Sequence, residues 1–126
     1  MIVIDSSGWI EYFAAGPLAP AYRPYIHNLS QIITPTICIY EVYKRLKREL
    51  GEDAADIALA KMLQTNVVPL TDYLAMHAAN TSLTTKLAMA DAVIYTIAQE
   101  YGVKVVTSDP DFQHLPDVLY LPKPNP

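Results

Sequence analysis

The sequence contains a single cysteine, Cys38, and three histidines that are widely separated. A lone cysteine cannot form an internal disulfide, and Cys38 has no cysteine or histidine neighbour at the spacing of a zinc site. These absences exclude a disulfide-stapled fold and agree with a reducing compartment. We interpret Cys38 as a small buried apolar residue rather than as a nucleophile.

The chain also lacks a net positive charge and a long hydrophobic run. Nine basic and thirteen acidic residues give a formal net charge of -4, which argues against a protein that coats nucleic acid by bulk electrostatic attraction. The apolar run at residues 2–4 ends at Asp5 and follows no basic segment, so it resembles neither a signal peptide nor a membrane span. We therefore expect a cytoplasmic protein without a membrane anchor.

The composition is that of a folded globular protein. Hydrophobic residues make up 52% of the chain and charged residues 17%. Disordered chains have too few apolar groups to offset the entropy lost on folding, so this balance favours a stable core. A chain of 126 residues suits one domain, and we expect a single domain over residues 1–126.

Short apolar runs alternate with segments in which apolar residues recur every three or four positions, which predicts alternating strands and helices. Ser7 is predicted to cap the first helix, and Thr71 or Asp72 a later one. Such alternation favours a parallel sheet with right-handed crossovers and helices on both faces. We expect strands at residues 2–4, 31–34, 67–70, 103–107 and 118–121, and helices within residues 8–15, 21–29, 39–50, 53–64, 73–81 and 87–101.

Four acidic residues are predicted to gather at one edge of this sheet. Asp5 follows the first strand directly, and Asp109 follows the fourth strand after one intervening residue. In an open parallel sheet, the functional site lies beyond the carboxyl ends of the strands. Glu41 and Asp91 lie early in helices whose first turns face the same edge, so all four carboxylates are expected to converge there.

Bringing these acids together is costly, because two like charges about 4 Å apart repel by roughly 4 kcal/mol at an effective dielectric constant near 20. No lysine or arginine stands beside Asp5, Asp91 or Asp109 in the sequence, so a divalent cation is the natural counterion. Ligands that are all oxygen favour Mg²⁺ or Mn²⁺ over Zn²⁺. Because such ions activate water and position phosphates, we expect hydrolysis of phosphodiester bonds.

Each acid also has an ordinary structural interpretation. Asp5 and Asp109 follow strands, where aspartate often caps a helix or stabilises a turn. Glu41 precedes two basic residues by three and four positions, and it could form only surface ion pairs with them. Asp91 is harder to explain in this way, because it interrupts an apolar helix in which an unpaired charge is costly. The joint pattern is what favours a shared site.

Four segments, spread over nearly the whole chain, match one family pattern. They are Ile-Asp-Ser-Ser at residues 4–7, Glu41 at the start of its helix, Leu-Ala-Met-Ala-Asp-Ala-Val-Ile at residues 87–94, and Val-Thr-Ser-Asp-Pro-Asp-Phe at residues 106–112. Together these segments resemble the PIN-domain ribonucleases, in particular the VapC-type toxins. The last two segments are the most specific, because an apolar run that ends in aspartate is common.

The resemblance implies a three-layer α/β/α PIN-like fold whose central parallel sheet has four to five strands. It also implies an endoribonuclease in which Asp5, Glu41, Asp91 and Asp109 are catalytic and bind Mg²⁺ or Mn²⁺. Asp111 matches a position that often holds a further acid of the metal site. The metal-activated water would attack the RNA backbone.

The resemblance extends to supporting residues and to partners. Ser6 and Thr107 match small hydroxyl positions that would orient a carboxylate or a metal-bound water. The implied partners are an RNA substrate, a cognate antitoxin protein that blocks the site, and a second copy of the chain in a homodimer.

Three basic residues follow Glu41 on its helix. Lys44, Arg45 and Arg48 lie three, four and seven positions after it, so they share a helix face with it and could guide an RNA backbone towards the metals. A solvated surface without a partner explains the same pattern, and the sequence does not separate the two interpretations.

Three rival functions fit a small α/β domain less well. A non-catalytic RNA- or protein-binding module on the same scaffold predicts the loss of one or more acids, whereas all four are present. A response-regulator receiver needs an acidic pair after the first strand and a lysine after a later strand, and neither is found. A phosphatase with an Asp-x-Asp nucleophile needs an aspartate where Ser7 stands.

Overall fold

The computed structural model describes residues 1–124, and five strands in this range form one parallel sheet. Its strand order is β3-β2-β1-β4-β5, and every neighbouring pair is parallel, as the sequence predicts. The strands are β1 (Ile2–Ile4), β2 (Ile32–Pro35), β3 (Asn66–Val68), β4 (Lys104–Thr107) and β5 (Val118–Tyr120).

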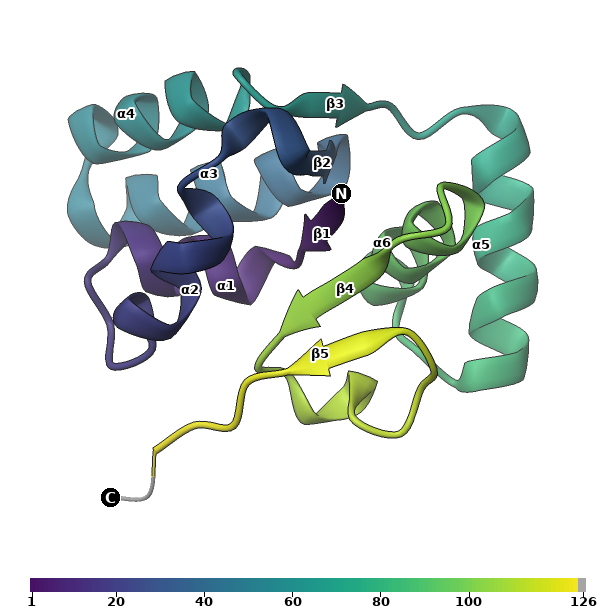
Figure 1. Ribbon diagram of the computed structural model, residues 1–126. Coiled ribbons are helices and arrows are strands. Elements are labelled where there is room, and N and C mark those ends of the chain that lie inside the picture. Colours follow the sequence, from purple (N-terminus) through teal and green to yellow (C-terminus); the bar gives the residue numbers. More distant parts are fainter. Residues whose placement is uncertain (125–126) are drawn as a thin grey trace.

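Two groups of helices cover the two faces of the sheet. The first two crossovers run in one direction and the third runs back, so right-handed connections place α1 to α4 on one face and α5 and α6 on the other. Figure 1 shows these two groups on opposite sides of the strands, which confirms the three-layer prediction. The helices are α1 (Ser6–Phe13), α2 (Ala19–Ile26), α3 (Thr36–Leu50), α4 (Glu52–Met62), α5 (Asp72–Thr85) and α6 (Met89–Glu100), with short 3-10 turns at Leu29–Gln31 and Pro110–Phe112.

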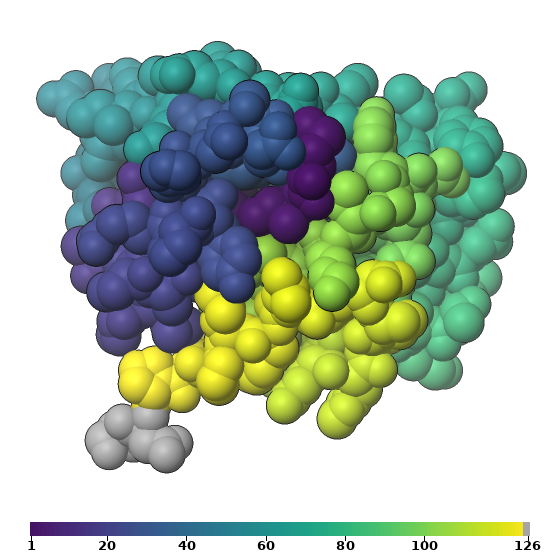
Figure 2. All heavy atoms as spheres, viewed as in Figure 1, coloured from purple at the N-terminus to yellow at the C-terminus, as the bar shows by residue number. Residues whose placement is uncertain are grey.

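The core is built on the central strand β1. Val3 pairs with Ile33 of β2 on one side and with Val105 of β4 on the other, and at most 2% of each of these residues is exposed. Strands buried on both faces need continuous apolar runs, which explains their hydrophobic sequence. Figure 2 shows the N-terminal residues, in purple, as a narrow strip between the blue and green parts of the chain.

The start of α1 differs from the sequence prediction. Asp5, not Ser7, caps this helix, because Oδ1 of Asp5 accepts a hydrogen bond from the backbone N–H of Gly8 at 3.1 Å. Ser7 lies inside the first turn and donates its hydroxyl to the same oxygen at 2.7 Å. The prediction that Ser7 is the cap is therefore wrong, while the alternative between Thr71 and Asp72 resolves to Thr71, which accepts from the N–H of Leu74.

Helix and strand ends otherwise differ from the expected bounds by a few residues. The second helix ends at Ile26 rather than at residue 29, because Leu29–Gln31 forms a separate 3-10 turn. The long apolar helix begins at Met89, two residues after Leu87, whose side chain is already buried in the core. Cys38 is fully buried, as expected, and burial raises the pKa of its thiol. Within residues 1–124, no helix is both long and apolar enough to span a membrane.

The stability of the fold should depend on the seam between α6 and the sheet. Ile94 on α6 is 1% exposed, whereas Ile57 on α4 is 67% exposed. We expect Ile94→Ala to lower the free energy of unfolding by about 2–5 kcal/mol, because it removes buried methyl groups and leaves a cavity. The same change at Ile57 should stay within about 0.5 kcal/mol. Urea denaturation of both variants measures the difference, and equal losses would contradict the assigned burial.

Candidate functional site

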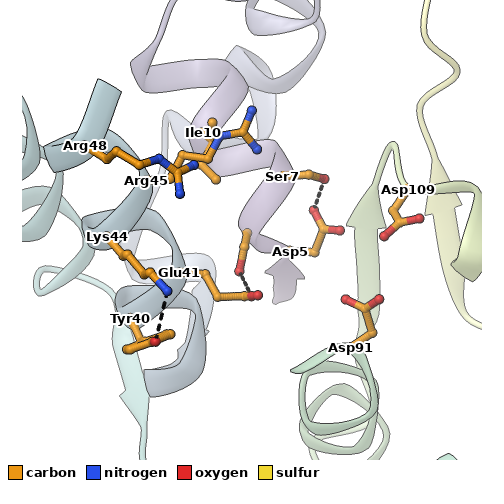
Figure 3. A pocket seen from close by; sticks show the side chains of 11 residues that line it. Asp5, Ser7, Ile10, Tyr40, Glu41, Lys44, Arg45, Arg48, Asp91 and Asp109 are labelled. Carbon is orange, nitrogen blue, oxygen red and sulfur yellow. Dashed lines mark hydrogen bonds between the residues drawn. The ribbon is translucent and has the colours of Figure 1, made fainter. Parts of the chain in front are cut away.

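A hollow of about 320 Å³ lies beyond the carboxyl ends of β1 and β4. Between these two strands the sheet order changes direction, because β2 and β3 extend to one side of β1 and β4 and β5 to the other. Ligands of open α/β sheets bind at such a switch point. The hollow is lined by Asp5, Ser6, Ser7, Ile10, Tyr40, Glu41, Lys44, Arg45, Arg48, Asp91 and Asp109, which Figure 3 draws as sticks.

Asp5 is held rigidly at the base of this hollow. It is only 2% exposed, and three donors fix its carboxylate. Oδ1 accepts from the Ser7 hydroxyl and the Gly8 N–H, and Oδ2 accepts from the Thr107 hydroxyl at 2.6 Å. Burial raises the pKa of Asp5, and these hydrogen bonds oppose the rise because they favour the ionised form.

Thr107 joins the first acid to the turn that carries Asp109. Its hydroxyl donates to Asp5 and accepts from the backbone N–H of Asp109 at 2.9 Å. Asp109 in turn accepts from the N–H of Asp111 at 2.9 Å and so caps the 3-10 turn that follows β4. The position of Asp109 is therefore tied to the position of Asp5.

Three carboxylates form a compact group beside this turn. Asp91, in the first turn of α6, Asp109 and Asp111 each offer an oxygen atom, and these atoms all lie within 4.8 Å of one another. Asp5 and Glu41 line the same hollow but lie outside this group of three. The four acids predicted from the sequence thus line one hollow. Asp111, which the sequence predicted as a further acid of the site, lies beside Asp91 and Asp109.

Crowding of negative charge changes the titration of Asp91. Burial and then the neighbouring carboxylates, first Asp109 and then Asp5, raise the pKa of Asp91 to about 7. Within the described part of the chain, no ion pair involves any of these aspartates, since the ion pairs join basic residues to Glu49 and Glu52. The repulsion is therefore not relieved by a cationic side chain.

Glu41 bonds to a hydroxyl group rather than to the basic residues that follow it. Its Oε1 atom accepts a hydrogen bond from the Ser6 hydroxyl at 2.6 Å, which joins α3 to α1. Among residues 1–124, Glu41 forms no ion pair, and Arg45 and Arg48 instead lie 3.1 Å and 3.5 Å from Glu49. Figure 3 shows Glu41 pointing into the hollow, between the basic residues and Asp5.

One buried interaction near the site has no signal in the sequence. The Tyr22 hydroxyl donates to the Ser108 hydroxyl at 2.9 Å, and both residues are at most 1% exposed. This bond joins α2 to the residue before Asp109, across 86 positions of sequence. Burial raises the pKa of Tyr22, so the phenol stays protonated and remains a donor.

The residues of the hollow fit a hard divalent cation. The compact group of Asp91, Asp109 and Asp111 offers carboxylate oxygens and no nitrogen or sulfur ligand. Mg²⁺ and Mn²⁺ prefer such a set of ligands. Hydrogen bonds from Ser6, Ser7 and Thr107 orient further carboxylates next to this group. Such an arrangement can hold a cation and a phosphate that approaches it.

Comparison with protein families gives one match. The family model described as PIN domain matches residues 2–118. A search of curated proteins found no relative of this sequence.

Several solved structures share the fold. VapC20 from Mycobacterium tuberculosis, described as a sarcin-ricin loop cleaving toxin, has a TM-score of 0.79 and 22% identity, with 94% of this chain and 97% of that chain covered. A toxin-antitoxin complex from Klebsiella pneumoniae has a TM-score of 0.78 and 22% identity, with 94% and 96% covered. DNA-bound VapBC from Salmonella typhimurium has a TM-score of 0.75 and 16% identity, with 96% of each chain covered.

The raised pKa of Asp91 predicts how the metal-free protein responds to pH. The pKa of Asp91 is about 7 in the folded chain against 3.8 for an unperturbed aspartate, so between these two pH values the folded state holds a proton that the unfolded state has lost. Stability should therefore fall as the pH rises from about 4 to about 7. We expect Asp91→Asn to remove much of this fall, raising the melting temperature near pH 8 by at least about 3 °C, the shift that roughly 1 kcal/mol produces in a domain of this size.

Differential scanning calorimetry in the presence of a chelator tests this expectation. Asp53→Asn is the matched control, because Asp53 is an exposed acid in the first turn of α4, away from the hollow. The control should keep the pH dependence of the unmutated chain. The same fall in all three proteins would show that Asp91 does not carry the excess charge.

Proposed function

This chain belongs to the PIN domain family, and on that premise we propose that it is a single-domain endoribonuclease that hydrolyses RNA phosphodiester bonds with Mg²⁺ or Mn²⁺. The observation that carries the proposal is the group of three carboxylates within 4.8 Å of one another, beyond the ends of β1 and β4, without a cationic side chain paired to them in residues 1–124.

We assign Asp91, Asp109 and Asp111 as the acids that would hold the cation, with Asp5 and Glu41 completing the site. When bound, the ion would polarise the attacking water and offset negative charge on the scissile phosphate. The chain itself fixes the geometry. Because hydrogen bonds hold Asp5 and Glu41 in place, little reorganisation is needed when RNA arrives.

Hydroxyl side chains and basic side chains have different roles in the proposed reaction. Ser6 and Thr107, each within 2.6 Å of a carboxylate oxygen, would orient Glu41 and Asp5. The basic side chains on α3 lie across the hollow from Asp91 and Asp109 (Figure 3), where they would bind the phosphates that flank the cleaved bond.

A non-catalytic binding module on the same scaffold is the alternative. Burial and then the neighbouring carboxylates raise the pKa of Asp91 to about 7, and a module that only binds a partner gains nothing from this cost to the stability of the fold. The concentration of acids is instead what a cation-dependent hydrolase requires. For this reason, we favour catalysis over binding alone.

We extend the proposal to regulation and assembly. Relatives in fold are described as toxin-antitoxin complexes, so we propose that this chain is a VapC-type toxin inhibited by a cognate antitoxin, and that it acts in the cytoplasm on cellular RNA. We also propose a homodimer. Exposed apolar side chains on α5 and α6, including Leu83 at 79% and Met89 at 75% exposure, offer surface for such contacts.

The proposal predicts a cation-dependent ribonuclease activity that the acids carry. Purified protein should cleave RNA in Mg²⁺ or Mn²⁺ and should stop cleaving when a chelator is added. Asp5→Ala and Asp91→Ala should each lower the rate by at least about 100-fold, because each removes a carboxylate that binds the cation or fixes its geometry. Gel analysis of labelled RNA measures the rates.

Two controls make this test specific. Asp53→Ala removes an exposed acid of α4 and should retain the activity of the unmutated chain. Circular dichroism should show that the Asp5 and Asp91 variants remain folded. Full activity in either folded variant, or in chelator, would overturn the proposed mechanism.

A further inference from the structure

Tyr40 is an exposed aromatic residue at the rim of the acidic hollow. Its side chain is 59% exposed, although exposed aromatic rings are costly to leave in water. Among the described residues that line the hollow, it is the one aromatic side chain, and it directly precedes Glu41 on α3. The mechanism proposed above does not use it.

Contacts with Lys44 hold the ring in place. The Nζ atom of Lys44 lies 5.5 Å from the centre of the Tyr40 ring and donates to the Tyr40 hydroxyl at 3.4 Å. In residues 1–124, no carboxylate lies at ion-pair distance from Lys44. The lysine is therefore free to bind an anion while it keeps the ring oriented, and the exposed part of the ring stays open to a second planar group.

Tyr40 begins a stripe of residues along one face of α3. Lys44 and Arg48 follow at intervals of four positions, or about 6 Å of helix each, so the three side chains share a face. Within residues 1–124, Arg48 pairs only with exposed Glu49, at 3.5 Å, and a surface ion pair of this kind is weak enough to exchange for a phosphate. Figure 3 shows the basic side chains and Tyr40 on the side of the hollow opposite Asp91.

We propose that Tyr40 stacks on an unpaired base of the RNA next to the cleaved phosphate, while Lys44 and Arg48 bind the phosphates that follow. This inference rests on the proposed ribonuclease function and adds the side chain that would contact an unpaired base of the substrate. In a duplex, each base is already stacked on its neighbours, so the ring would find no face to contact. Base–aromatic stacking and a basic groove together are the usual way in which proteins bind single strands.

The alternative partner for the Tyr40 ring is a protein. The ring also borders an apolar groove with Ile39, Tyr43 and Leu59, where a polypeptide could pack. The unpaired charge of Lys44 and the position of the ring one residue from Glu41 favour RNA, because both features face the site where phosphate is expected. A protein contact would not discriminate between paired and unpaired RNA.

Fluorescence anisotropy tests the proposal with three RNA probes. They are a short labelled strand without self-complementarity, the same strand annealed to its complement, and a strand of the same length with abasic sites throughout. All proteins carry Asp91→Asn, which the proposed function predicts to block cleavage. Tyr40→Leu should weaken binding of the intact single strand about 5- to 150-fold, the loss expected for one stacked base. It should leave the duplex and the abasic strand unchanged.

Two variants separate stacking from charge. Tyr40→Phe keeps the ring and should bind the single strand within about twofold of its parent. Lys44→Ala should weaken single strand and duplex alike and should lower the slope of log affinity against log salt by about 0.7 on the single strand.

The outcomes distinguish this proposal from the function on which it rests. If the unmutated chain cleaves RNA but Tyr40→Leu binds all three probes like its parent, the stacking proposal is overturned and the ribonuclease function stands. Equal losses on single strand and duplex also overturn it. If the chain neither binds nor cleaves RNA, both proposals fail. Retained RNA binding with loss of a protein partner in Tyr40→Leu would assign the ring to that partner instead.

Discussion

Mutual repulsion between carboxylates is the constraint on which the rest of this structure depends. The switch in strand order between β1 and β4 brings Asp5 and Asp109 to one edge of the sheet, and the first turn of α6 adds Asp91. No side-chain cation within residues 1–124 pairs with them, and the pKa of Asp91 rises to about 7. Oxygen donors crowded in this way suit a divalent cation, which is the ligand that we propose for the site.

Hydroxyl groups keep the acids in place against that repulsion. Thr107 bonds Asp5 and the backbone of Asp109 together, so the two strand ends act as a unit. Ser6 holds Glu41 at the boundary between α1 and α3, and buried Tyr22 holds the residue before Asp109. The basic residues of α3 lie across the hollow from Asp91 and Asp109, so the positive charge that would attract the proposed RNA substrate does not neutralise these acids.

Much of this arrangement could be predicted from the sequence, because strands buried on both faces leave a clear apolar pattern and acids that follow such strands share one edge. The parallel sheet, the helical layers and the family, which a match over residues 2–118 supports, were all predictable. The cap of α1 was not, because Ser7 and Asp5 both suit that position and only the three-dimensional hydrogen bonds show that Asp5 accepts. The bond between Tyr22 and Ser108 joins distant segments and leaves no local signal.

The central claim is that the acids bind a divalent cation in place of protons. Isothermal titration of Mn²⁺ into the metal-free protein near pH 7, in two buffers of different ionisation enthalpy, tests it most directly. We expect saturable binding with release of about half a proton per site, because a group with a pKa of about 7 is half protonated at pH 7 before the cation arrives. The proton release should disappear in Asp91→Asn. Absence of saturable binding, or the same proton release in that variant, would contradict the claim.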